Sequence, residues 1–240
     1  TIRPGYKQTE VGVIPEDWDV YDLSEIYDFS SGLSKGKKDF GFGYPFLSYK
    51  TIYSNHFIPD NLSDLANTTS SERNSSSIKL ADVFLTRTSE TAEDIGISTV
   101  ALKDYHTATF NGFAKRLRLK RGLKINPKYE GYFFRSNIFR RQASTVCSVT
   151  TRASLSESLL RSMKIIIPSP EEQEAIGDSL FDFDQFLISL EKLILKKKNL
   201  KQGLIQELLT GKKRLPGFSV EWEVKKLGDF GYFKGGNGFP

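Results

Sequence analysis

The stretch "PSPEEQEAIGDSLFDFDQFLISLEKLILKKKNLKQGLIQELLTGKK" (168–213) decides how the chain is organised. Two prolines end the apolar run before it, Ser169 is a good N-cap, and the carboxylates of "EEQ" favour the positive end of a helix. We predict a helix that runs to about Thr210 and is stopped by Gly211. Some forty residues at about 1.5 Å each make a rod of roughly 60 Å.

Apolar residues recur along this helix at spacings of three and four, which is the pattern of a coiled-coil seam. The predicted seam consists of Ile176, Leu180, Phe183, Leu187, Leu190, Ile194, Leu204 and Leu208. Two lysines, Lys197 and Lys201, interrupt the pattern before its last two leucines. So narrow a stripe on a long rod needs a partner helix to cover it.

The two halves of the helix carry opposite charges. Residues 171–191 hold seven acidic side chains and no basic ones, whereas residues 192–214 hold eight basic side chains and one acidic side chain. Two antiparallel copies would place each acidic half along a basic half, and parallel copies would place like charges together. The alternative is that these charges only complement the helix dipole, which acts within the terminal turns. Because many of them lie in mid-helix, we expect an antiparallel coiled coil.

A short repeat follows the helix. "WDVYDLSEIYDFSSG" (18–32) and "WEVKKLGDFGYFKGG" (222–236) align without gaps at an offset of 204 residues, with five identities in fifteen positions. Unrelated segments would share about one. The chain therefore holds one full period and the start of another, either as the front part of a two-copy protein or as a naturally shortened form. Trp18 and Trp222 begin the copies, and we expect both to be core anchors rather than base-stacking residues.

We predict three parts: a mixed domain (1–168), a spacer helix (169–211) and the start of a second copy (212–240). The fold class is α+β, with a twisted β-sheet in the first part. Alternating apolar and polar residues predict strands in three stretches, 82–88, 95–102 and 113–120, the last with one wet face. The segment 126–142 suits a helix, and the serine-rich segment 67–77 suits a polar loop.

The composition excludes several classes of protein. One cysteine and two histidines in 240 residues leave no internal disulfide and make a zinc site improbable. There is no apolar run of membrane-spanning length, so we expect a cytoplasmic protein without a membrane segment. "NPKY" (126–129) only faintly resembles an amino-methyltransferase motif, and no phosphate-binding loop is present. We therefore expect no catalytic residues and no cofactor.

The segment 168–218 resembles the central spacer of the DNA-specificity subunit of type I restriction-modification systems. Its pattern "P-x-x-EQ … LKQGLIQELLTGK" is specific, and "GYKQTEVGVIPEDWDVYDL" (5–23) and "TRTSETAEDIG" (86–96) are similar to parts of the target-recognition domain. The resemblance implies two such domains held apart by antiparallel helices, each reading half of a split site in double-stranded DNA. Methyltransferase subunits and restriction subunits would be its partners.

This chain departs from that pattern because it has one complete domain and one spacer helix. A homodimer of half-length subunits would restore the second domain. Two other hypotheses stay open, a DNA-modifying enzyme with its own active site, and an assembly or decoy protein that does not read DNA.

The DNA-contacting residues are expected in three polar loops and one basic strand. The loops are "GLSKGKK" (32–38), "TRTSET" (86–91) and "TTRAS" (150–154), and the strand lies in a run with ten basic residues and one acidic residue (115–141). Arginine, serine and threonine side chains suit phosphates and base edges. The candidates are Lys35, Lys37, Lys38, Arg87, Thr88, Ser89, Arg116, Arg118, Thr151 and Arg152. A merely solvated basic surface, or arginines paired with nearby carboxylates, is the alternative.

Overall fold

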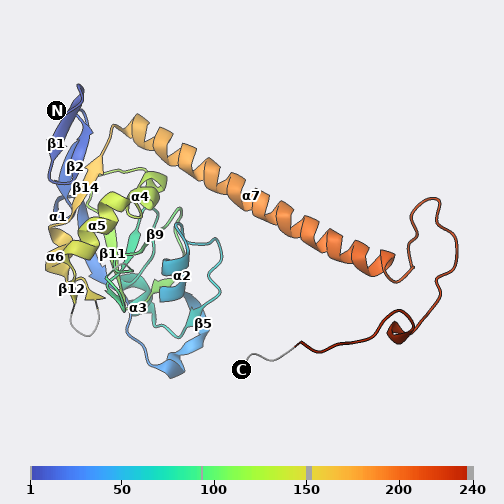
Figure 1. Ribbon diagram of the computed structural model, residues 1–240. Helices are drawn as coiled ribbons and strands as arrows, with labels where there is room; N and C mark the ends of the chain where they lie inside the picture. The colour runs from blue at the N-terminus through green and yellow to red at the C-terminus, as the bar shows by residue number, and fades with distance from the viewer. Residues whose placement is uncertain (1, 93, 150–152, 237–240) are drawn as a thin grey trace. The chain divides into compact units, whose positions relative to one another are not determined.

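Figure 1 shows the computed structural model of the chain, which describes residues 2–92, 94–149 and 153–236. The chain divides into two compact units, Thr1–Asp184 and Gln185–Pro240. Helix α7 (Pro170–Leu208) begins in the first unit and ends in the second. It therefore begins and ends close to the positions that the sequence predicts.

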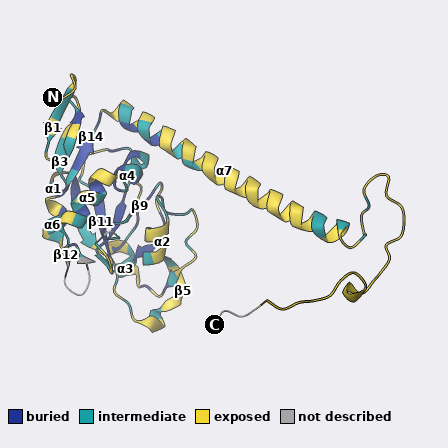
Figure 2. Ribbon diagram, viewed as in Figure 1, coloured by how far each residue is buried: buried dark blue, intermediate teal, exposed yellow. Residues whose placement is uncertain are grey.

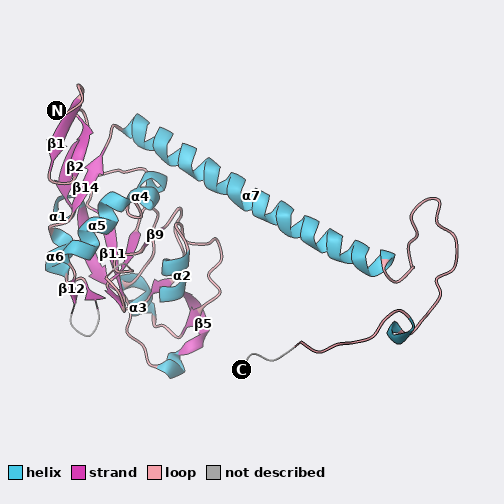
Figure 3. Cartoon of the chain, viewed as in Figure 1, coloured by secondary structure: helices cyan, strands magenta, loops and turns pink. Residues whose placement is uncertain are grey.

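Strands and helices alternate irregularly along the first unit (Figure 3). The strands are β1 (Tyr6–Thr9), β2 (Gly12–Pro15), β3 (Asp19–Asp22), β4 (Tyr27–Ser31), β5 (Phe40–Leu47), β6 (Leu65–Ala66), β7 (Val83–Thr86), β8 (Thr88–Ser89), β9 (Ser98–Val100), β10 (Thr109–Phe110), β11 (Ala114–Leu119), β12 (Ser148–Val149), β13 (Ala153–Ser154) and β14 (Lys164–Ile167). Besides α7, the helices are α1 (Leu23–Ile26), η1 (Lys37–Asp39), α2 (Tyr49–Ser54), α3 (Ser70–Ser75), α4 (Pro127–Phe133), α5 (Asn137–Val146), α6 (Glu157–Arg161) and η2 (Leu227–Asp229). The α+β class is confirmed, although the described strands form five small sheets rather than one.

The largest sheet has the strand order β4-β11-β7-β9, with every neighbouring pair antiparallel. One face carries Val83, Leu85 and Leu117, which join a core with residues of α4 and α5. The other face carries Phe84 and Ala114, which join a second core. Because both faces are covered, residues 114–117 are buried, and the expectation of a wet face on this strand is wrong.

Two local predictions need correction. The expected helix 126–142 is two helices, because the chain turns after α4 and the Ser136 side chain caps a new helix, α5, by accepting a hydrogen bond from Phe139 N. The expected loop 67–77 contains helix α3, which starts with a capping box. In it the Thr69 hydroxyl accepts from Glu72 N at 3.3 Å, and Thr69 N donates to the Glu72 carboxylate at 2.8 Å.

The first turns of α7 pack on the domain. Gln173 and Gly177 are buried, and the Trp18 indole N–H donates to Glu172 Oε2 at 2.8 Å. Tyr132 donates to Asp184 Oδ2 at 2.7 Å. These contacts anchor the first turns of α7 on the domain. Trp18 is half-buried against the core, as expected for an anchor.

From residue 185 to residue 203, α7 is exposed on all sides (Figure 2). The predicted seam residues Leu180, Phe183, Leu187, Leu190 and Ile194 are between 37% and 67% exposed. Ile176 packs instead against the core of the first unit, because α7 is seated on the domain there. Leu204 and Leu208 are half-buried. The helix is thus confirmed, whereas the coiled coil stays a prediction.

The second copy of the repeat reproduces one local contact of the first. Asp22 N donates to the Glu25 carboxylate at 2.7 Å at the start of α1, and Lys226 N donates to the Asp229 carboxylate at 3.1 Å at the start of η2. The two contacts are 204 residues apart, the offset of the sequence repeat. The prediction of Trp222 as a core anchor is wrong in this structure, because its side chain is 55% exposed.

Among the residues that the structure describes, no helix combines the length and apolar character needed to cross a bilayer.

Candidate nucleic-acid interface

Two of the predicted loops and one turn lie at the same end of the central sheet. Strands β4 and β7 end there and β11 begins there, since Lys115 pairs with Ser31 and Ala114 pairs with Thr86. The loops that follow β4 and β7 are two of the three loops predicted to contact DNA. The turn at 111–113 precedes β11 and lies between them.

Backbone hydrogen bonds join these segments. Leu33 N donates to Phe110 O and Gly112 N donates to Leu33 O, both at 2.8 Å, so the loop 32–38 starts against the turn. Glycine is required at this contact, since a Cβ on Gly32 would lie 2.4 Å from the carbonyl oxygens of Phe110 and Asn111. On the other side, Arg87 N donates to Phe113 O at 3.0 Å. The turn therefore holds both loops at the same edge.

The third predicted loop approaches the second through a small sheet with the order β12-β13-β8. Ala153 pairs with Ser89 and Ser154 pairs with Thr88, so the end of the segment 150–154 lies beside the segment 86–91. Thr151 and Arg152 lie outside the described residues, and their contact with DNA stays a prediction. The loops 32–38 and 86–91, together with Ala153 and Ser154 at the described end of the third loop, thus lie at the same end of the central sheet, and we call this surface the loop edge.

Three of the predicted cationic side chains at the loop edge are free to meet an anion. Lys37 and Lys38 are exposed, Arg87 is half-exposed, and within the described part of the chain none of the three has an ion-pair partner. Lys35 is different, because its ammonium lies 2.6 Å from Glu72 Oε1. This ammonium and the backbone N–H of Thr69 lower the pKa of the Glu72 carboxyl to about 2.

Most basic residues of the run 115–141 bond to other parts of the domain. Arg118 forms an ion pair with the buried Asp82 at 2.6 Å, and Arg116, only 8% exposed, donates to Ser77 O at 2.6 Å. Burial lowers the pKa of the Arg116 guanidinium. The prediction that Arg116 and Arg118 contact phosphates assumed an exposed face on this strand, and the structure covers that face.

Other residues of the run serve the same structural purpose, because they bond to carbonyl oxygens or carboxylates of the domain. Their partners are Glu157 for Lys115, Ser24 O for Lys120, Asp178 for Lys128, Ser98 O for Arg135 and Ile95 O for Arg140. Burial lowers the pKa of Arg135 to about 10. The number of basic residues in this run therefore overstates the basic surface of the domain.

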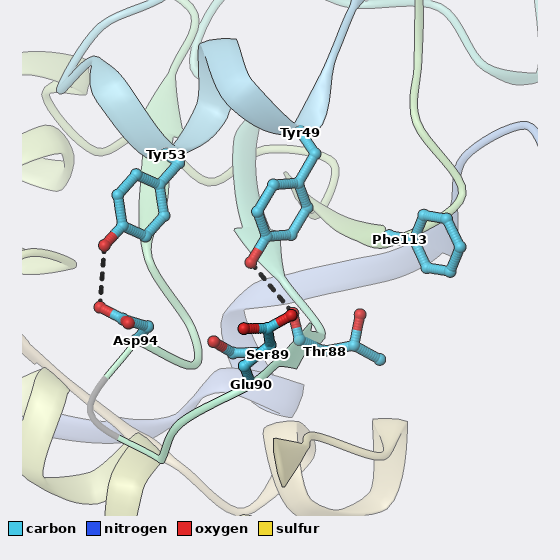
Figure 4. A pocket seen from close by; sticks show the side chains of 7 residues that line it. All are labelled: Tyr49, Tyr53, Thr88, Ser89, Glu90, Asp94 and Phe113. Carbon is cyan, nitrogen blue, oxygen red and sulfur yellow. Dashed lines mark hydrogen bonds between the residues drawn. The ribbon is translucent and has the colours of Figure 1, made fainter. Parts of the chain in front are cut away.

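A cavity of about 350 Å³ opens beside the loop edge. Figure 4 shows two tyrosines, Tyr49 and Tyr53, extending from α2 toward the loop after β8, with Phe113 beside them. The two phenol rings are stacked, with centroids 6.4 Å apart and planes at 17°. The remaining lining residues are Thr88, Ser89, Glu90 and Asp94. Burial raises the pKa of the Tyr49 hydroxyl.

Of the residues that line this cavity, only Thr88 and Ser89 were predicted from the sequence as DNA contacts. The aromatic residues belong to a short helix and a turn that carry no binding motif. One signal was available: Tyr49 and Tyr53 follow the N-cap Ser48 at a spacing of four, which places both on one face of a helix. No group of three or more histidine, cysteine or acidic side chains that would suit a metal ion occurs in the described ranges.

Comparison with known proteins identifies the family of this chain. The family described as "Type I restriction modification DNA specificity domain" matches residues 15–201, which include the domain, the loop edge and most of α7. The chain belongs to this family. The resemblance inferred from the spacer and domain motifs is therefore confirmed.

Relatives and solved structures agree with this family. The type I restriction enzyme MjaIX specificity subunit of Methanocaldococcus jannaschii is 26% identical over 250 residues, covering 98% of this chain and 56% of that subunit. The HsdS subunit from Thermoanaerobacter tengcongensis has a TM-score of 0.53 at 17% identity, covering 85% of this chain and 47% of that one. The type I restriction-modification S subunit from M. genitalium has a TM-score of 0.53 at 16% identity, covering 79% and 45%. The chain spans about half the length of the curated relatives it matches.

Proposed function

We propose that this chain reads double-stranded DNA through its loop edge and directs methyltransferase and restriction subunits to a split target site. The observation that carries the proposal is that two polar loops and the described end of a third lie at one end of the sheet in a specificity-family domain. Lys37, Lys38 and Arg87 have no ion-pair partner among the described residues, so they supply attraction for phosphates. Serine and threonine side chains on the same loops supply hydrogen-bonding groups for base edges.

The proposal assigns no catalysis to the chain itself. Its curated relatives are named specificity subunits. Methyl transfer and cleavage therefore belong to its partner subunits. A DNA-modifying enzyme with its own active site is the alternative that the experiment below must exclude.

Helix α7 is the basis for the split target site in this proposal. Its exposed seam and its oppositely charged halves suit an antiparallel partner helix, either from a second copy of this chain or from a second repeat in a longer protein. Its 39 residues correspond to a rod of roughly 60 Å at about 1.5 Å per residue. This length is somewhat under two turns of duplex at about 34–36 Å per turn. Two reading domains would then contact half-sites separated by a fixed spacer.

The test is to express the chain with its methyltransferase and restriction subunits and to map the methylated bases in the cellular DNA. A motif made of two specific halves around an unspecified spacer is expected, and a palindromic pair of halves would indicate a homodimer. A methyl-transfer assay on the purified chain alone should give no product. Transfer by the chain alone would favour the enzyme, and absence of any specific binding or methylation in the assembled system would favour the assembly or decoy protein.

A further inference from the structure

The cavity beside the loop edge has aromatic walls and a polar floor. Tyr49 and Tyr53 from α2 form one wall, and the Phe113 side chain, 59% exposed, stands beside them (Figure 4). Phe113 belongs to the turn that holds two of the loops together, and the floor residues follow Arg87 directly in sequence. A volume of about 350 Å³ is at the lower end of the range for small-ligand sites, which suits one edge of a base pair.

The protons of both tyrosine hydroxyls are already committed. Tyr49 donates to Thr88 O at 3.1 Å, and Tyr53 donates to Asp94 Oδ1 at 2.9 Å. The other oxygen of Asp94 accepts from the Thr91 hydroxyl at 2.9 Å. The hydroxyls of Thr88 and Ser89 can donate or accept, so they do not discriminate between ligands. The tyrosines and Asp94 therefore form the frame of the cavity rather than its reading group.

Glu90 is the lining residue whose charge is uncommitted. Its side chain is exposed, and none of the described residues forms a hydrogen bond or ion pair with it. A carboxylate next to a polyanion is repelled unless it accepts a hydrogen bond from the ligand, because an ionised carboxylate can only accept. With no partner among the described residues, the Glu90 carboxylate is free to accept a hydrogen bond from a donor on the DNA.

The base edges of the major groove differ in what they offer to such an acceptor. Guanine presents two acceptors, thymine presents an acceptor, and adenine presents an acceptor beside its amino group. Cytosine alone presents an amino donor with no adjacent acceptor. Its neighbouring C5 position is apolar and suits contact with an aromatic ring.

We propose that this cavity reads a cytosine in the major groove, with the Glu90 carboxylate accepting a hydrogen bond from the N4 amino group and with Phe113 and Tyr49 beside C5. The inference rests on the proposed function, since it names one base that the loop edge selects. It makes Glu90 a specificity-determining residue.

The experiment uses the complete assembly with its methyltransferase subunits. First, the methylated motif of the wild-type chain is mapped, and each cytosine of its half-site is replaced in turn by pyrimidin-2-one, which lacks only the amino group. Binding of the duplexes is then measured by fluorescence anisotropy for the wild-type chain, for Glu90→Ala and for the control Glu16→Ala. Glu16 is an exposed glutamate of the segment after β2, and its substitution removes one negative charge in the same way.

At one cytosine, loss of the amino group should weaken binding by the wild-type and Glu16→Ala assemblies about ten-fold. The Glu90→Ala assembly has no acceptor at this position, so it should be insensitive to the same loss, and its methylated motif should relax at that position alone. The reading of cytosine is overturned if the wild-type motif contains no fixed C·G pair, or if Glu90→Ala responds to every replacement as the wild-type chain does. A wild-type assembly with no motif at all overturns the proposed function, and this inference with it.

If Glu90→Ala abolishes binding altogether, Glu90→Asp provides the second variant, because it keeps the acceptor and shortens the side chain. Restored selectivity for the same cytosine supports the reading role. Loss of all binding in Glu90→Asp, with circular dichroism unchanged, overturns it.

Discussion

The buried carboxyl of Glu130 makes stability fall as the pH rises. The residue is completely buried, its Oε1 accepts from the Tyr27 hydroxyl at 2.7 Å, and its Oε2 has no partner among the described residues. Burial raises the pKa of Glu130 well above the ordinary value for a glutamate. The carboxyl is therefore protonated in the folded domain at pH values at which the unfolded chain has already lost the proton.

The sign follows from proton linkage. Between the unfolded pKa of about 4.3 and the raised folded pKa, the folded state binds more protons, so the free energy of unfolding falls by up to about 1.4 kcal/mol per pH unit. The contribution of the protonated Glu130 carboxyl to the free energy of unfolding is complete below the unfolded pKa and is lost progressively as the pH rises above it. The loss ends where the pH passes the folded pKa, so its total measures how far burial raises the pKa of Glu130. Glu130→Gln has no such proton to lose, so this part of the pH dependence should vanish.

Urea unfolding of the wild-type chain and of Glu130→Gln, followed by circular dichroism at pH 5, 6 and 7, measures the effect. Relative to the wild-type chain, the variant should gain stability with each step in pH. The amide brings two donors that need partners, and this adds an offset that does not depend on pH. A difference between the two proteins that stays constant from pH 5 to pH 7 would refute the reasoning.

Three further outcomes are expected. Gly177→Val should destabilise the first unit by about 1–3 kcal/mol in thermal unfolding, because a Cβ there lies 2.9 Å from Tyr129 N. Gly203→Ala, in open space on the same helix, should instead stabilise α7 slightly, and equal losses in the two variants would contradict the contact. Leu187→Asp should turn a dimer into a monomer in light scattering, and an unchanged mass would argue against the seam. Arg87→Ala should weaken binding to the cognate site by about ten-fold and to random DNA by less, whereas equal losses would make Arg87 a phosphate contact.

The sequence predicted the long helix well because its signals are local and repeated. Caps, the spacing of apolar residues and the final glycine all lie within the segment itself. The repeat was equally accessible, since aligned residues need no knowledge of the fold, and the matched backbone contacts at Glu25 and Asp229 agree with it.

The predictions that concern residue partners were weaker, because partners come from distant parts of the chain. Arg118 has the same appearance in the sequence as an exposed arginine, yet its partner Asp82 lies 36 residues away. The two loops predicted from their polar residues do lie at one edge, but the turn that joins them, with Phe113, carries no signal of its own. Helix α3 could have been found from Thr69 and Glu72, whose spacing is that of a capping box.

The strands at the two ends of the domain are neighbours. β3, near the start, pairs with β14, directly before α7, with Asp19 opposite Ile167. The segment between β3 and β14 thus begins and ends on one pair of neighbouring strands. A segment from a related domain that begins and ends on an equivalent pair could replace the loops of the loop edge, provided that it supplies equivalents of Lys128 and Tyr132, which contact α7. New sequence preferences could arise by recombination in this way.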